Sequence, residues 1–249
     1  EGWLVGGRRV SIIPADWAVF AFLAVFVPVW GWFDHRSFLR RESVADTDVL
    51  SAEYMKTMAL HGVIAASVLV TWFVLGRDWA ALGFRDPNLA GNFRIGSLIA
   101  AALLIGMVLN LLGGLVSGKG DPARLKAYGQ LAPFLPKTPR QHRWGMALSV
   151  SAGVAEEIAY RGFVMWMLAF FMPVYAVIAV QAVVFGLAHA YQGWGGAVGT
   201  AILGAVIGLV YWATGSLFLP ILLHVLVDAM SLSLAYFTYR RQAGREAGV

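Results

Sequence analysis

Seven stretches of mostly apolar residues follow one another along the chain. Each has a length close to the about 20 residues that a helix needs to cross a bilayer. In lipid, every backbone N–H and C=O must be hydrogen-bonded within the protein. A single apolar segment satisfies this requirement by forming a helix. We therefore predict an all-α, polytopic transmembrane helix bundle with seven spans, or eight if the long fourth segment is split. The predicted spans cover about residues 14–33, 55–75, 95–116, 144–171, 174–191, 197–214 and 217–239.

The composition supports a membrane protein and excludes other classes. Hydrophobic residues make up 59% of the chain and charged residues 13%, about half the charged share of a soluble domain. The chain contains no cysteine, so disulfides and cysteine-based sites are excluded. The net charge of +5 does not point to nucleic acid, because the lysines and arginines lie in short loops where they set topology. We expect the lipid bilayer as a partner, and no nucleic acid.

The positive charges are divided unevenly between the two faces of the predicted bundle. Most lysines and arginines fall on the face that holds the loops after the first and third spans and the C-terminal tail. By the positive-inside rule, this face and the C-terminus are cytoplasmic. We divide the chain into an N-terminal three-helix region with a polar loop (1–143), a membrane core (144–239) and a basic tail (240–249).

Ionisable residues lie inside three of the four C-terminal spans. A charged group at membrane depth costs about 3 kcal/mol or more, so it normally faces the bundle interior with a partner. The number of such residues in one half of the chain exceeds what packing requires, and we predict that they converge in one internal cavity. They are Glu156, Glu157 and Arg161 in one helix, His189 at the end of the next, and His224 and Asp228 in the last.

The spacing of these residues suggests how they pair. Glu157 and Arg161 are four residues apart and can form an ion pair on one helix face. Glu156 is turned by about 100° from Glu157, which leaves its carboxylate free to act on water. His224 and Asp228 are also four apart, so the carboxylate can orient the imidazole and fix its tautomer.

Other interpretations of single residues are structural. A Glu–Arg pair inside a membrane helix can serve packing alone, and a histidine near a helix end, such as His189, is more often an interfacial residue. His61 in the second span has no partner nearby in the sequence, so we interpret it as structural or pore-lining. The predicted helix ends also put His189 near the cytoplasmic face, with Glu156 and His224 about 18 and 20 Å deeper at 1.5 Å per residue. The occurrence of these ionisable residues together on three helices favours a functional over a purely structural interpretation.

Three short motifs formed by these residues resemble those of a known protease family. Residues 156–161 are EEIAYR, residues 185–189 are FGLAH and residues 224–228 are HVLVD. In this order they resemble the EExxxR, FxxxH and HxxxN/D motifs of the CPBP family, the CAAX proteases and bacteriocin-processing (Abi) proteins. The resemblance covers about residues 144–239, and the three N-terminal helices carry no motif of the family.

The resemblance implies an intramembrane endopeptidase of the CAAX type, a glutamate or metalloprotease-like hydrolase with a polypeptide substrate. Glu156 would be the general base that deprotonates the attacking water. His189 would position that water or carry a proton, and His224 would stabilise the oxyanion.

The remaining motif residues would support these three. Asp228 stands where some family members have Asn; an ionised Asp donates no hydrogen bond, so we expect it to orient His224 rather than to bind the oxyanion. Glu157 and Arg161 would hold the helix and the base in place.

The sequence leaves open whether the site binds a metal ion. Glu156, His189 and His224 could form a two-histidine, one-carboxylate zinc site with a free position for water. The chain contains no HExxH, however, and a zinc-bound Glu156 could not also be a free base. We expect no cofactor, with zinc as the alternative.

Two further functions compete with proteolysis. A proton- or ion-coupled transporter would also bury Glu, Arg and His, but it would spread polar residues over both halves of the chain and show an internal repeat. A non-catalytic membrane scaffold could keep the same motifs without turnover. We predict an endopeptidase of a bacterial inner membrane that acts on a membrane-associated, leader or CAAX-type substrate.

Overall fold

The computed structural model describes residues 4–5, 8–9, 11–42, 48–87, 93–116 and 129–246, and most of them belong to helices. A two-residue antiparallel pair, β1 (Leu4–Val5) and β2 (Arg8–Arg9), precedes the helices. Within these described ranges no other strand occurs. The predicted all-α class is confirmed.

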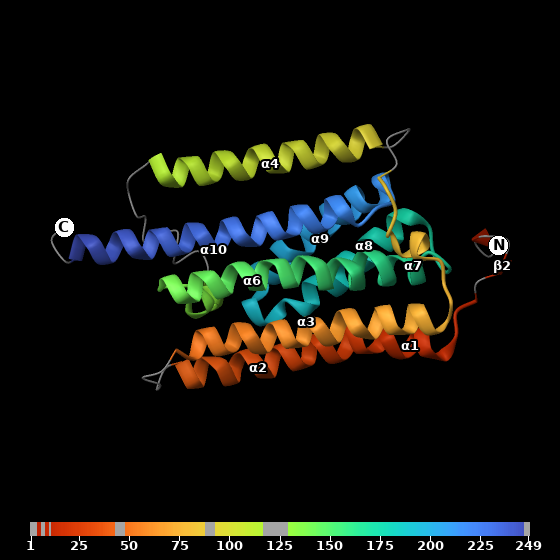
Figure 1. The fold of residues 1–249 in the computed structure, drawn as a ribbon, viewed down its shortest axis with the longest axis horizontal. Helices are drawn as coiled ribbons and strands as arrows, with labels where there is room; N and C mark the ends of the chain where they lie inside the picture. Colours follow the sequence, from red (N-terminus) through yellow and green to blue (C-terminus); the bar gives the residue numbers. More distant parts are fainter. Residues whose placement is uncertain are drawn as a thin grey trace.

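Seven long helical segments follow, at the seven positions predicted from the apolar runs (Figure 1). They are α1 (Pro14–Ala21) continued by the π-helical η1 (Phe22–Phe26) and α2 (Val27–Glu42); α3 (Val49–Val74); α4 (Phe93–Val116); α6 (Pro139–Glu156) continued by the π-helical η4 (Glu157–Val164) and α7 (Met165–Leu168); α8 (Val174–Ala188); α9 (Trp194–Thr214); and α10 (Phe218–Glu246). The connections contain short 3-10 helices, η2 (Trp79–Leu82), η3 (Gly129–Phe134) and η5 (Ala190–Gln192).

Four helical segments in the described part of the chain are long and apolar enough to cross a membrane. α8 is shorter, with 15 residues, than the about 20 of a full span. The number of crossings, seven or eight, therefore stays a prediction. The four segments are Pro14–Glu42, Val49–Val74, Trp194–Thr214 and Phe218–Gly244.

The distribution of side chains is that of an integral membrane protein. Large apolar side chains face outward; Phe73, for example, is 74% exposed and Tyr175 is 75% exposed. Charged side chains such as Glu157 and Arg161 are fully buried instead. A surface this apolar is unfavourable in water, but lipid tails are as apolar as the side chains that meet them.

Two helices continue beyond the predicted spans. α2 extends through the polar stretch up to Glu42, and α10 extends into the basic tail up to Glu246. We placed the predicted helix ends where the apolar runs end. A helix can continue past that point, because its polar residues can extend beyond the hydrocarbon core of the bilayer. Arg40 and Arg41 lie in the last turn of α2, where cations interact favourably with the helix dipole.

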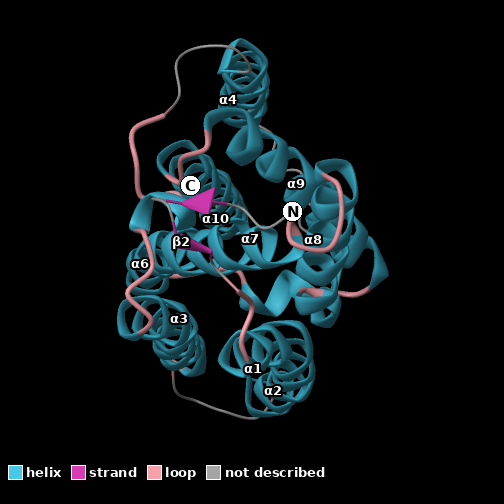
Figure 2. Cartoon of the chain, turned by 90° about the vertical axis from the view of Figure 1, so that its right-hand side faces the viewer, coloured by secondary structure: helices cyan, strands magenta, loops and turns pink. Residues whose placement is uncertain are grey.

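The helices form an elongated bundle in which α6 lies between α3 and α10 (Figures 1 and 2). α6 packs between α3 and α10, and α8 packs against α9. α4 lies at one edge, against α9 and α10, and the α1–α2 segment lies at the opposite edge. The C-terminal half thus provides the centre of the bundle.

Local sequence signals set the start of the two helices that matter most for the site. Asp48 caps α3 and accepts a hydrogen bond from the backbone N–H of Ser51. Thr138 and Gln141 form a capping box at the start of α6, where Pro139 occupies the first turn. These starts fix which residues of α3 and α6 face each other further along.

A glycine on α6 lets α10 approach closely next to the site. A Cβ atom at Gly153 would lie 2.5 Å from Cγ2 of Val225 and 3.2 Å from the carbonyl oxygen of Ile221. We expect Gly153→Ala to lower the free energy of unfolding by about 1–3 kcal/mol, because α10 would have to shift. Gly62→Ala on α3 is the control, since nothing lies within 4 Å of the added carbon. Thermal unfolding in detergent measures both, and equal midpoints would contradict the close packing.

Candidate active site

The motif with two glutamates lies where α6 passes from an α-helix into a π-helix. Glu156 is the last residue of α6, and the eight residues of η4 that follow are all buried. A π-helical segment changes which side chains share a face, and such segments occur frequently at functional sites. The apolar pattern predicted a helix here but not its π-helical form.

Arg161 forms the predicted ion pair with Glu157. Its Nη1 donates to Oε1 of Glu157 at 2.7 Å, and both side chains are fully buried. Its Nη2 donates to the carbonyl oxygen of Gly204 at 3.3 Å, and its Cζ lies 4.4 Å from the ring centroid of Phe185. Arg161 therefore joins η4 to both α8 and α9.

Glu157, and not Asp228, is the carboxylate nearest to His224. Nδ1 of His224 lies 2.6 Å from Oε1 of Glu157. Nε2 of His224 lies 3.7 Å from Oδ2 of Asp228, which is beyond hydrogen-bond distance. The spacing of four residues allowed Asp228 to reach the ring, but a glutamate from another helix lies closer. Glu157 thus orients the imidazole and leaves Nε2 directed toward Glu156.

His189 is fixed by the residue four positions before it. Nδ1 lies 2.8 Å from the carbonyl oxygen of Phe185, and the two rings are 4.6 Å apart between centroids. A carbonyl oxygen only accepts, so Nδ1 carries the hydrogen and Nε2 is the nitrogen that faces the site.

The depth of His189 follows from the short helix α8. The turn between α8 and α9, where Gly193 has a φ of 85°, lies short of the ends of α6 and α10 along the bundle (Figure 1). A non-glycine residue rarely adopts such a φ. His189 therefore lies at the depth of Glu156, and the offset of about 18 Å expected at 1.5 Å per residue does not arise.

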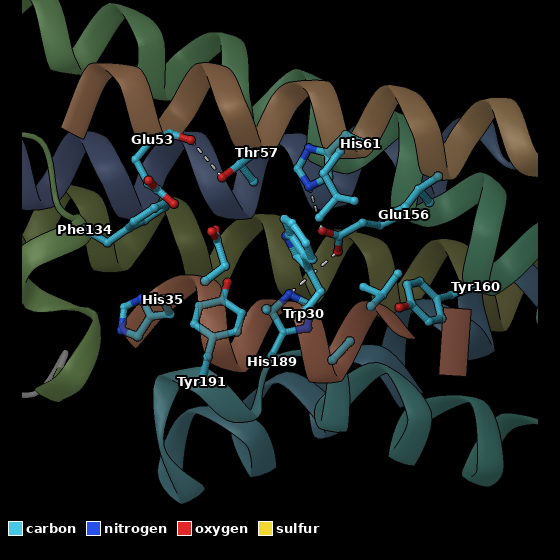
Figure 3. Close-up of a pocket in the computed structure, with 16 residues that line it drawn as sticks. Trp30, His35, Glu53, Thr57, His61, Phe134, Glu156, Tyr160, His189 and Tyr191 are labelled. Carbon is cyan, nitrogen blue, oxygen red and sulfur yellow. Dashed lines mark hydrogen bonds and ion pairs between the residues drawn. The ribbon is translucent and has the colours of Figure 1, made fainter. Parts of the chain in front are cut away.

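Glu156 lies among three histidines: His61 and His189, both seen in Figure 3, and His224. Nε2 of His61 is 3.3 Å from Oε1 of Glu156. On the other oxygen, Oε2, Nε2 of His189 is 3.7 Å away and Nε2 of His224 is 3.9 Å away. Oε2 itself has no hydrogen-bond partner within the described residues. One oxygen of the carboxylate is thus held, and the other faces two imidazole rings.

Two cavities meet at this carboxylate. The larger has a volume of about 760 Å³ and extends between α6, α9 and α10, with Asp228 in its wall. The smaller, about 90 Å³, extends between α2 and α3 (Figure 3). The first volume is within the range of pockets that hold ligands, roughly 300–1,000 Å³. The residues common to both walls are Thr57, His61, Phe134, Glu156, His189 and Tyr191.

The predicted site residues therefore converge, and one residue was not predicted. The six residues of the three motifs are linked by contacts to one another in the interior. His61 joins them from α3, although its sequence neighbours offer no partner. A histidine inside an apolar span was the available signal, and it was interpreted as structural or pore-lining.

Zinc is compatible with the types of ligand at the site, because zinc binds imidazole nitrogens and carboxylate oxygens. Among the residues that the structure describes, no group of three His, Asp or Glu side chains is arranged to hold a metal ion as it stands. Zinc therefore stays a hypothesis, with His189 and His224 as the residues that would hold it beside Glu156.

A buried carboxylate beside imidazoles, in a bundle of apolar helices and at the junction of two cavities, is an arrangement that could carry out acid–base chemistry within the bundle. Residues 139–230 match the family model described as type II CAAX prenyl endopeptidase Rce1-like. The match over these residues agrees with the resemblance of the three motifs and supports a membrane endopeptidase of the CAAX type. The match begins with α6, ends within α10 and contains all three motifs. No curated protein and no solved structure matches the chain.

Proposed function

We propose that the chain is an intramembrane endopeptidase in which Glu156 activates water for attack on a peptide carbonyl. The observation that carries the proposal is the position of Glu156, with Oε1 near His61 and Oε2 facing His189 and His224. An ionised carboxylate placed in this way can take a proton from a water held against Oε2.

The two histidines near Oε2 divide the remaining tasks. Nε2 of His189 lies where it can hold the attacking water beside Glu156. Nδ1 of His224 donates to Glu157, so His224 can also donate from Nε2 when its ring is protonated, and this imidazolium can stabilise the carbonyl oxygen as that atom gains negative charge. The new C–O bond forms as Glu156 takes the proton from water. The C–N bond then breaks, and Glu156 returns the proton to the leaving amine.

The larger cavity is suited to an extended polypeptide. Gly195 and Gly199 of α9 line it, and a Cβ atom added at either would meet nothing within 4 Å. Glycines at a cavity wall let another backbone approach closely. We propose that a membrane-associated polypeptide, either a lipidated CAAX-type segment or a leader peptide, enters here with its scissile bond next to Glu156.

We also propose that the end of the bundle with the C-terminus faces the cytoplasm of a bacterial inner membrane. The C-terminal ends of α2 and α10 and the N-terminal end of α6 lie together at that end (Figure 1). Basic residues concentrate there, including Arg41, Arg140 and Arg241, which supports this orientation by the positive-inside rule.

The test of the proposed function is peptide cleavage by purified protein in proteoliposomes. The probes are a peptide ending in Cys-aliphatic-aliphatic-X, with and without a farnesyl group, and a leader peptide without lipid. Cleavage of one probe by wild type and not by Glu156→Ala supports an endopeptidase. A well-folded wild type that cleaves none of them favours the non-catalytic scaffold.

Chelation tests whether Glu156 acts as a free base. We expect activity to survive strong chelators, because the proposed chemistry needs only an ionised carboxylate and two imidazoles. Elemental analysis of the purified protein is the accompanying measurement, with His189→Ala and His224→Ala as controls. One zinc per chain in wild type that is lost in both variants would make Glu156 a metal ligand instead.

A further inference from the structure

His61 contacts the site from outside the domain that the family model covers. It lies on α3, in the N-terminal region, and it is 6% exposed. Its Nε2 is 3.3 Å from Oε1 of Glu156, and its Nδ1 is 3.1 Å from Oγ of Ser151. Both ring nitrogens thus have partners, and both partners are on α6.

These two contacts fix the form of the imidazole. A hydroxyl can donate its hydrogen to Nδ1, and a neutral imidazole then carries its own hydrogen on Nε2. Nε2 of His61, 3.3 Å from Oε1 of Glu156, can then donate to that oxygen. A hydrogen bond there would occupy one oxygen of the carboxylate and leave the other facing His189 and His224.

We propose that His61 is a positioning residue of the hydrolytic reaction, which holds Oε1 of Glu156 so that Oε2 is presented to the attacking water. This inference rests on the proposed function of Glu156. It makes α3 part of the active site, although the family match begins only at residue 139.

A packing role alone does not account for His61, because α3 and α6 are held together elsewhere. Leu50 and Tyr54 of α3 form a buried apolar cluster with Leu148 of α6. The hydroxyl of Tyr54 also donates to the carbonyl oxygen of Phe134 in η3. The contact between the helices therefore does not require a polar residue at the position of His61.

A serine, a histidine and a glutamate in a row are also the parts of a serine hydrolase triad. Ser151 is not among the residues that line either cavity at the site, so a substrate carbonyl has no route to its hydroxyl there. The geometry therefore favours Ser151 as the partner that fixes the His61 tautomer rather than as a nucleophile.

Steady-state kinetics of His61→Phe and His61→Gln test the proposal. Phe keeps a ring but donates no hydrogen bond, and we expect kcat to fall by about 10- to 100-fold, the effect of one hydrogen bond to a charged group. KM should change less than kcat, because the proposed role of His61 is to position Glu156 and not to bind the substrate. Gln can donate from its amide nitrogen and should restore most of kcat. Ser67→Ala on α3 is the control, since its hydroxyl bonds only the carbonyl oxygen of Ile64.

Ser151→Ala keeps the proposal testable if His61→Phe does not fold. Loss of the donor to Nδ1 should lower kcat by about 3- to 10-fold, the effect of one neutral hydrogen bond, with KM unchanged. An unchanged kcat would overturn the proposal. Loss as complete as in Glu156→Gln would also overturn it, because Ser151 would then act as a nucleophile.

Two results separate this proposal from the proposed function. If wild type cleaves peptide and depends on Glu156, but His61→Phe is as active as wild type, only the role of His61 is wrong. If wild type cleaves nothing, the contact is still tested by thermal unfolding of His61→Phe, Glu156→Ala and the double variant. If the change in unfolding free energy of the double variant differs from the sum of the two single changes, the contact is supported. Additive changes overturn it.

Discussion

Glu156→Gln is expected to lower kcat for peptide cleavage by about 10²- to 10⁴-fold, the usual contribution of a general base. The amide has the size of the carboxylate and keeps an oxygen that can accept the hydrogen bond from His61. It cannot take a proton from water, so the loss should fall on kcat and not on folding. Initial rates in proteoliposomes, together with thermal unfolding in detergent, measure the two effects separately.

Glu157→Gln is the matched control for this prediction. Glu157 is adjacent in sequence and buried, but its carboxylate contacts Arg161 and His224 and not the proposed water. A neutral amide can still accept a hydrogen bond from one of them, so we expect a smaller loss of activity than in Glu156→Gln. Equal losses in two folded proteins would show that the two carboxylates have been assigned the wrong roles.

Arg161→Leu is expected to lower the free energy of unfolding by about 3–5 kcal/mol, because it leaves the buried Glu157 carboxylate without its arginine and with His224 as the remaining partner. Glu157 and Arg161 are fully buried, and the guanidinium also donates to Gly204 of α9. The substitution therefore removes contacts between three helices. Unfolding in detergent, followed by circular dichroism, gives the size of the effect.

The double variant Glu157→Gln/Arg161→Leu distinguishes a lost ion pair from lost packing. Neutralising Glu157 removes the buried charge that Arg161→Leu leaves behind, so the double variant should be more stable than Arg161→Leu alone. If the two destabilisations simply add, the ion pair does not account for the burial of Arg161.

The helical segments were predictable because the bilayer restricts what an apolar run can become. Each of the seven apolar runs corresponds to a long helical segment. Helix ends were less predictable: α2 continues through a charged stretch to Glu42, which apolarity alone places outside the span. The π-helical form of η4 was not predicted, since it depends on packing around Glu157 and Arg161 rather than on composition.

The motif residues were predictable, but their partners across helices were not. Spacing within one helix predicted the pair of Glu157 with Arg161, which the structure confirms. The same rule paired His224 with Asp228, whereas the packing of α10 against α6 brings Glu157 closer to the ring. The place of His61 depends likewise on how α3 packs against α6, which no local spacing in the sequence indicates.

The most direct test of the central claim is mass spectrometry of the peptide products formed in water enriched in oxygen-18. Purified wild type in proteoliposomes is incubated with the farnesylated peptide, and Glu156→Gln is treated identically. We predict two products from wild type whose masses add up to the substrate plus one water, with one oxygen-18 in the new carboxyl terminus, and intact peptide from Glu156→Gln. Products without the heavy oxygen, or equal cleavage by the two proteins, would contradict a Glu156-activated water.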